Sequence, residues 1–325
     1  MTTFVKSKIF ISFLTFIISA SALIPSVLRL TEHGDEAIYA WGGNYFLDKI
    51  LKLDFSPTGT DSYTDPGWDP LSIWASTGPN LTRIMYGVPL KITKVPIPEL
   101  PYAWGDPKLQ GSKTHLSIIT LRMLRFIAIS CAALGFSFIA FRWRWKGLLI
   151  VLLMLLIPHV RDDLSRGWAE GPLLLGIGLI ITTFGTRLFP LVLGIAGSLK
   201  FTAMGFWPLV LIPGAYSRKK LSRIMGLIIT PLVWSFVTPP SWYMGGPIYI
   251  VYIFIWRLRW WLTDAHKMVS SPYYIEATPE LQNPFGLFIP TRYLWPIELM
   301  LISGLILGFP YITLFIRKHM LHKEI

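Results

Sequence analysis

The chain has 325 residues, of which 53% are hydrophobic and only 15% charged, so it carries too few charges to cover a soluble globule. High hydrophobicity excludes a disordered chain, and a single cysteine excludes a disulfide scaffold. The formal net charge of +12 comes from short basic clusters between apolar runs, a placement that favours membrane topology over nucleic-acid binding. We therefore predict an all-α polytopic membrane protein that contacts membrane lipids and binds no nucleic acid.

The first apolar run covers residues 9–28, which is long enough to cross a bilayer as a helix. Two lysines precede it and predict a cytoplasmic N-terminus; the pattern also resembles a secretory signal, but the length of the run favours an uncleaved span. Residues 30–113 follow and hold ten of the eighteen acids. We predict that they form a large external loop with short membrane-surface helices at 35–53 and 79–94.

The remaining apolar runs predict seven further spans, several of them short enough to need neighbouring helices and snorkelling side chains. These runs are residues 114–141, 147–160, 171–186, 188–200, 204–217, 224–238 and 294–316. Residues 239–293 are expected to form a second external loop, in which the apolar run 248–256 is too short to span and dips into the membrane. The result is a single membrane domain over 1–325 with about eight spans and both termini cytoplasmic.

Asp35 and Glu36 lie at the start of the predicted external loop. Acids in the first turn of a helix suit its macrodipole, and capping is the simpler interpretation from composition alone. The functional interpretation is that Asp35, held at the external membrane surface, acts as a general base on an acceptor hydroxyl. His33 and its acidic neighbours would allow a divalent metal, although no ligand-spacing motif supports one.

Several cations are expected near the same external face, against the positive-inside trend. They are Arg83 in the first loop, Arg122 and Arg125 early in the second span, Arg166 after the third and Lys200 at the end of the fifth. A single cation at the end of a span is usually a snorkelling anchor. Arg122 and Arg125, three residues apart, are expected to share a helix face. Convergence of these cations on one side predicts an anionic partner, such as a phosphate at the outer leaflet.

Four stretches, in this order, resemble the GT-C superfamily of integral-membrane glycosyltransferases, and most of all the protein O-mannosyltransferases and the bacterial transferases that place aminoarabinose on lipid A. The stretches are Asp35-Glu36-Ala37-Ile38-Tyr39, Gly78-Pro79-Asn80-Leu81-Thr82-Arg83, Ser165-Arg166-Gly167-Trp168-Ala169-Glu170 and Leu199-Lys200-Phe201-Thr202-Ala203. The chain departs from the family pattern at Gly78, where histidine is usual, and at Asn80, where proline is usual. Glu170 stands one residue before the family's aspartate.

The resemblance implies inverting transfer of a sugar from a polyprenyl-phosphate donor to a protein, lipid or glycan acceptor at the external face of the membrane. It implies Asp35 as the general base and Glu36 as a group that orients the site. The cations named above would stabilise the departing phosphate. Further support is expected from Glu170, Tyr39, Arg257 and Arg259.

The resemblance implies that no nucleotide is needed, and the expected location is a prokaryotic plasma membrane. Two alternatives remain open: a multi-pass transporter or lipid flippase with a charged path at the bilayer midplane, and a noncatalytic GT-C-like subunit.

Overall fold

The computed structural model describes residues 3–30, 34–53, 80–95, 116–238 and 246–248. These residues belong to one compact unit that covers Met1–Tyr249. In this part of the chain the protein is all-helical, with 83% helix and no strands. The predicted all-α class is therefore confirmed for the described residues, whereas the predicted span at 294–316 and the loop segment 249–293 lie outside them.

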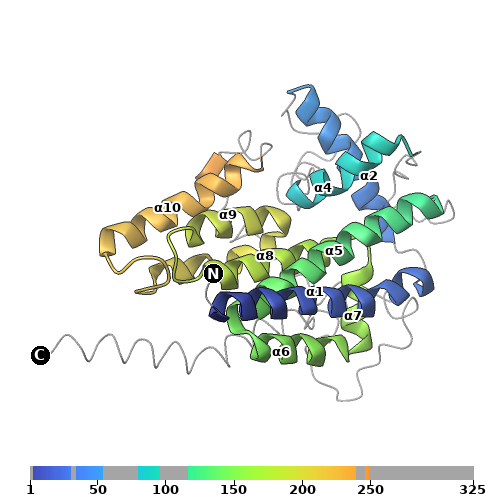
Figure 1. The fold of residues 1–325 in the computed structure, drawn as a ribbon. Helices are drawn as coiled ribbons and strands as arrows, with labels where there is room; N and C mark the ends of the chain where they lie inside the picture. The colour runs from blue at the N-terminus through green and yellow to red at the C-terminus, as the bar shows by residue number, and fades with distance from the viewer. Residues whose placement is uncertain (1–2, 31–33, 54–79, 96–115, 239–245, 249–325) are drawn as a thin grey trace, which may run out of the picture. The chain divides into compact units, whose positions relative to one another are not determined.

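Two long antiparallel helices, α1 (Thr3–Arg29) and α5 (Ile118–Trp143), lie side by side (Figure 1). Ser117 caps α5, since its hydroxyl oxygen accepts a hydrogen bond from the backbone N–H of Thr120. Within them, Ser7–Arg29 and Ile118–Trp143 are long and apolar enough to cross a membrane. They coincide with the predicted spans at 9–28 and 114–141.

After α5, the described residues form shorter helices. They are α6 (Trp145–Leu155), α7 (Pro158–Ser165), α8 (Glu170–Thr183), α9 (Phe189–Leu199), the 3₁₀ helix η1 (Phe201–Leu211), α10 (Lys220–Phe236) and the 3₁₀ turn η3 (Gly246–Ile248). The run 147–160, predicted as one span, is instead divided between α6 and α7. Pro158 begins α7, because a residue without an N–H is tolerated in a first turn but not in a helix interior.

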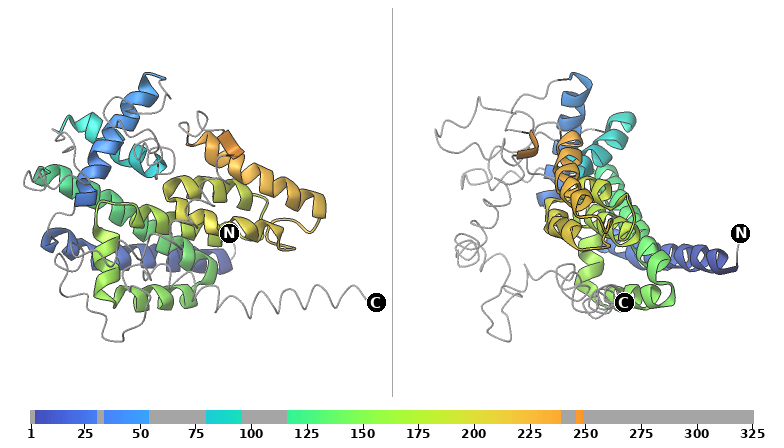
Figure 2. Two further views of the ribbon diagram at one scale, coloured as in Figure 1. Left: turned by 180° about the vertical axis from the view of Figure 1, so that it is seen from behind. Right: turned by 90° about the vertical axis from the view of Figure 1, so that its left-hand side faces the viewer.

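Small residues allow the helices to approach closely. A Cβ on Gly171 would lie 2.3 Å from the carbonyl oxygen of Ala128, and one on Gly178 would lie 2.4 Å from that of Gly135, so α8 touches the backbone of α5. The same holds where α9 and α10 lie side by side (Figure 2), because a Cβ on Gly194 would lie 2.7 Å from the Thr230 oxygen. Contacts of this kind between small residues are typical of helices packed in lipid.

Helices α2 (Gly34–Leu51) and α4 (Asn80–Thr93) confirm the helices predicted at 35–53 and 79–94. They cross at two glycines: a Cβ on Gly87 would lie 2.1 Å from the carbonyl oxygen of Gly43.

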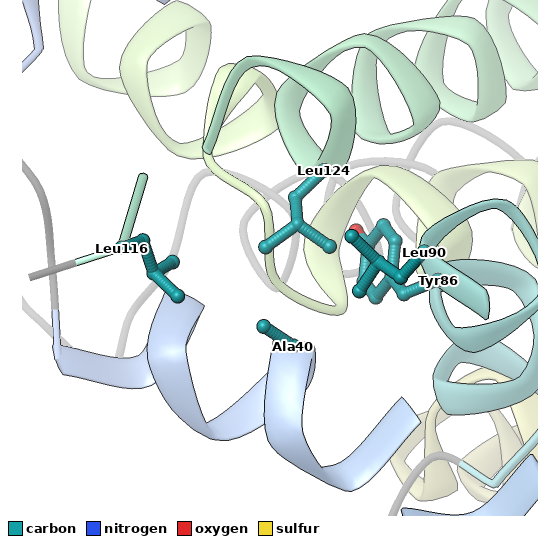
Figure 3. Packing of buried hydrophobic residues seen from close by; sticks show 5 residues of the cluster. All are labelled: Ala40, Tyr86, Leu90, Leu116 and Leu124. Atoms are coloured by element: carbon teal, nitrogen blue, oxygen red, sulfur yellow. The ribbon is translucent and has the colours of Figure 1, made fainter. Parts of the chain in front are cut away.

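A small apolar cluster joins this pair to the start of α5, as Figure 3 shows. Its buried members are Ala40, Tyr86, Leu90, Leu116 and Leu124. This cluster holds α2 and α4 against the N-terminal half of α5, where Arg125 lies.

Candidate functional site

Polar side chains from distant parts of the sequence meet where α2 and α4 join the bundle. Their contacts connect the first turn of α2, the start of α5, the segment between α7 and α8, and the end of α9. We call this set the polar junction; it comprises Glu36, Arg125, Asp163, Arg166, Glu170 and Lys200, together with the backbone N–H of Gly167. All but two of these residues were predicted as site residues from the sequence.

A buried ion pair between Glu36 and Arg125 links three segments. The guanidinium donates from Nε to Oε1 and from Nη2 to Oε2, both at 2.8 Å, and neither side chain is more than 1% exposed. The backbone N–H of Gly167 also donates to Oε1 at 2.8 Å. This bidentate geometry is the strongest that arginine and a carboxylate adopt, and its desolvated position makes loss of either partner costly.

Arg125 also secures the end of α1. Its Nη1 donates to the carbonyl oxygens of Val27 and Leu30, each at 2.9 Å. These carbonyls belong to the last turn of α1 and the residue after it, where helices leave backbone acceptors without internal partners. Arg122, three residues earlier on α5, is exposed. The two arginines that were expected to share a helix face thus lie in different environments.

A second ion pair joins α8 to the end of α9. The Lys200 ammonium pairs with Glu170, whose side chain is 8% exposed, whereas that of Lys200 is 32% exposed. Lys200 is therefore the accessible partner of the pair. The neighbouring hydroxyl of Thr82 donates to the Leu199 carbonyl oxygen at 2.7 Å, which ties α4 to the same end of α9.

The segment between α7 and α8 contributes an arginine and a tryptophan. The Arg166 guanidinium lies 5.6 Å from the centre of the Trp168 ring, within the range of a cation–π contact. The hydroxyl of Tyr86 on α4 donates to the Trp168 carbonyl oxygen. Tyr39 on α2 packs edge-on against Tyr86, with ring centres 5.9 Å apart, so it supports the junction from the side of α2.

Arg83 is fully buried on α4 beside α2. Its Cδ and Nε would lie 3.4 Å from a Cβ on Gly42, so the guanidinium stem runs close to the α2 backbone. Burial lowers the pKa of Arg83 to about 9, and the nearby Tyr39 opposes this shift. A nearby anion stabilises a cation in such an environment, because low polarity strengthens charge–charge attraction.

Asp163 is a member of the junction that the sequence analysis did not select. It lies on α7, is 5% exposed, and has Oδ2 3.3 Å from Nε2 of His159. Burial raises the pKa of the Asp163 carboxyl to about 7; the nearby Glu170 adds to the rise, and Arg166 opposes it. A usable signal was present, since Asp162, Asp163 and Glu170 are the only acids between residues 107 and 263.

The charges of the junction are arranged largely as pairs of a cation and a carboxyl group. Three of its cations act on its carboxyl groups: Arg125 pairs with Glu36, Lys200 pairs with Glu170, and Arg166 lies near Asp163. One of these carboxyls has a pKa near 7 and is partly neutral at neutral pH. Asp162 also acts on Asp163, so the described cations and acids of this region nearly balance.

The side chains of three predicted site residues lie outside the described part of the structure. Asp35 is the second residue of α2, next to Glu36, and only its backbone is described. Arg257 and Arg259 lie outside the described residues. Within the described ranges, no group of three or more His, Cys, Asp or Glu side chains is arranged to hold a metal ion.

Comparisons with protein-family models, with curated proteins and with solved structures found no match for this chain. The resemblance to the GT-C superfamily therefore depends on the four sequence stretches, and it stays a prediction.

Proposed function

We propose that the protein is a multi-pass membrane glycosyltransferase of GT-C type, which moves a sugar from a polyprenyl-phosphate donor to an acceptor hydroxyl at the external face. The observation that carries this proposal is the convergence of the four stretches on the polar junction. Glu36 of the first stretch binds Gly167 of the third. Thr82 of the second contacts Leu199 of the fourth. The Glu170–Lys200 pair joins the third and fourth stretches, so these three contacts lie in one region of the fold.

A membrane location is supported by the outward faces of the helices. On α1, Phe10 is 59% exposed, Phe13 64% and Leu28 68%. Large apolar side chains that face outward along a whole helix would be costly in water and are ordinary in lipid. Within the two candidate spans, every charged residue lies in the first or last eight residues, and α5 carries none from 126 to 141. This distribution disfavours a transporter with a charged midplane path.

In the proposed reaction Asp35 accepts the proton of the acceptor hydroxyl while the acceptor oxygen bonds to the anomeric carbon from the face opposite the phosphate. The bond between that carbon and the phosphate oxygen breaks, and the polyprenyl phosphate leaves with the electron pair. General-base assistance of this kind contributes about 10²–10⁴-fold. Inversion follows from attack on the opposite face.

The other residues divide into two groups. Glu36 and Arg125 are engaged with each other and with backbone groups, which supports a positioning role for Glu36 toward Asp35, its neighbour in the first turn of α2. Lys200, Arg166 and Arg83 carry the positive charge that would stabilise the departing phosphate. Lys200 and Arg166 are the more suitable, because both residues are partly exposed, whereas Arg83 is fully buried.

The test is transfer from a labelled polyprenyl-phosphate sugar in membranes that contain either the wild-type protein or Asp35→Asn. We expect the variant to accumulate and unfold like the wild type but to transfer no label above background. Full activity of Asp35→Asn would exclude Asp35 as the base. An inactive wild-type protein that nevertheless restores activity to a partner enzyme would identify a noncatalytic subunit instead.

A further inference from the structure

The end of the bundle opposite the polar junction gathers cations from four separate segments. Lys8 of α1 lies over the ring of Phe141 near the end of α5, with its ammonium 5.4 Å from the ring centre. Arg142 donates to the carbonyl oxygen of Phe184 at 3.4 Å, which joins the end of α5 to the turn between α8 and α9. The same turn also contacts the segment before α10, because the Gly185 N–H donates a hydrogen bond to the Ala215 carbonyl oxygen.

We call this surface the basic face. Its cations are Lys8, Arg142, Arg144, Lys146, Arg187, Arg218, Lys219, Lys220 and Arg223. The segments that form it contain no acid: no Asp or Glu occurs before Glu32, between Asp106 and Asp162, or between Glu170 and Asp264. The described acids instead lie on α2, on α7 and at the start of α8. The described acids are therefore confined to the end of the bundle that holds the polar junction, whereas cations occur at both ends.

The turn between α5 and α6 places one of these cations in an unusual backbone conformation. Arg144 has φ 56° and ψ −131°, a combination that glycine adopts without steric conflict and that other residues rarely adopt. Its neighbours Trp143 and Trp145 are 40% and 58% exposed. Cations flanked by exposed tryptophans at the end of an apolar helix are typical of the headgroup layer of a membrane, where the indole ring is stable at the boundary between water and lipid.

We propose that the basic face binds anionic phospholipid headgroups of the leaflet that it meets, an inference that depends on the proposed membrane location but not on sugar transfer. The cations lie within a turn or so of the ends of the apolar helices, so a bilayer around α1 and α5 brings headgroup phosphates to their level. A soluble polyanion would match the charge but not the exposed tryptophans. The face thus fits a phosphate that is anchored in lipid.

The experiment compares two exposed lysine pairs of equal charge. Lys219→Gln with Lys220→Gln alters the basic face, whereas Lys52→Gln with Lys94→Gln alters the region of α2 and α4. The full-length protein is purified in neutral detergent and titrated with phosphatidylglycerol, with phosphatidylcholine as the neutral lipid. The readout is the lipid concentration that gives half of the maximal rise in the thermal unfolding midpoint.

We expect phosphatidylglycerol to stabilise the wild type and the control pair equally. The basic-face pair should need about 25-fold more lipid, because each cation near an anionic surface contributes about fivefold in affinity. Equal titrations for the two pairs would overturn the proposal. So would equal stabilisation by phosphatidylcholine, or stabilisation by inositol hexaphosphate in place of the lipid.

Arg144→Gly provides a second test that does not depend on exposed lysines. Glycine suits the backbone of this turn, so the variant should unfold in neutral detergent at or above the wild-type temperature. It should nevertheless lose about fivefold in its response to phosphatidylglycerol. An unchanged lipid response would exclude Arg144 from the binding face. Neither readout involves sugar transfer. The proposed function can therefore fail while this inference holds, and this inference can fail while the proposed function holds.

Discussion

Removing the charge of Glu36 should destabilise the whole unit, since this side chain links three segments of the fold. Glu36→Gln keeps the size of the side chain but replaces one acceptor oxygen with an amide that donates. One of the two 2.8 Å hydrogen bonds from Arg125 is then lost, and a donor faces a donor in a site that is at most 1% exposed. Breaking a buried pair from one side costs about 3–5 kcal/mol, equivalent to about 6–20 °C in the unfolding midpoint.

The assay is thermal unfolding of the purified chain in neutral detergent. The matched control is Lys91→Gln, which breaks the exposed pair with Asp48 and should cost no more than about 1 kcal/mol. Replacing both Glu36 and Arg125 with leucine should not restore stability, because the carbonyls of Val27 and Leu30 lose their donor. A midpoint for Glu36→Gln equal to that of Lys91→Gln would refute this reasoning.

Two further predictions concern packing and pH. Gly87→Ala places a methyl group 2.1 Å from the Gly43 oxygen and should lower stability by about 1–3 kcal/mol, whereas Gly205→Ala, with nothing within 4 Å, should change it by less than about 0.5 kcal/mol in the same unfolding assay. Asp163 binds its proton more tightly folded than unfolded, with a pKa near 7 rather than 3.8, so stability falls as pH rises through this window. Between about pH 5.5 and 8 the wild type should lose about 2 kcal/mol, and Asp163→Asn should remove most of that loss; an equal loss in both proteins would exclude Asp163 as its source.

Much of the helical framework was accessible from the sequence. The two long apolar runs became α1 and α5, and even the short helices of the first loop were predicted, at 35–53 and 79–94. Uncharged runs of this length and turns marked by proline and glycine are local signals, so no knowledge of tertiary contacts was needed. The separation of α6 from α7 at Pro158 was missed because the apolar run continues across it.

The site was harder to predict, because its partners are far apart in the sequence. Glu36 and Arg125 are separated by 89 positions, and composition alone cannot show that they pair. Asp163 was overlooked since a carboxyl with a raised pKa looks like any other acid until its burial is known. What the sequence did contain was the set of motifs, and most of their charged residues lie in the polar junction.

The most direct test of the central claim is the level of lipid-linked sugar in cells that lack the protein. Mass spectrometry of lipid extracts should show one polyprenyl-phosphate sugar accumulating, together with loss of the glycan that receives it. Wild-type protein should return both to normal, and Asp35→Asn, present in equal amount in the membrane, should return neither. Unchanged polyprenyl-phosphate sugars in the deletion cells, or full rescue by Asp35→Asn, would contradict the proposed transferase.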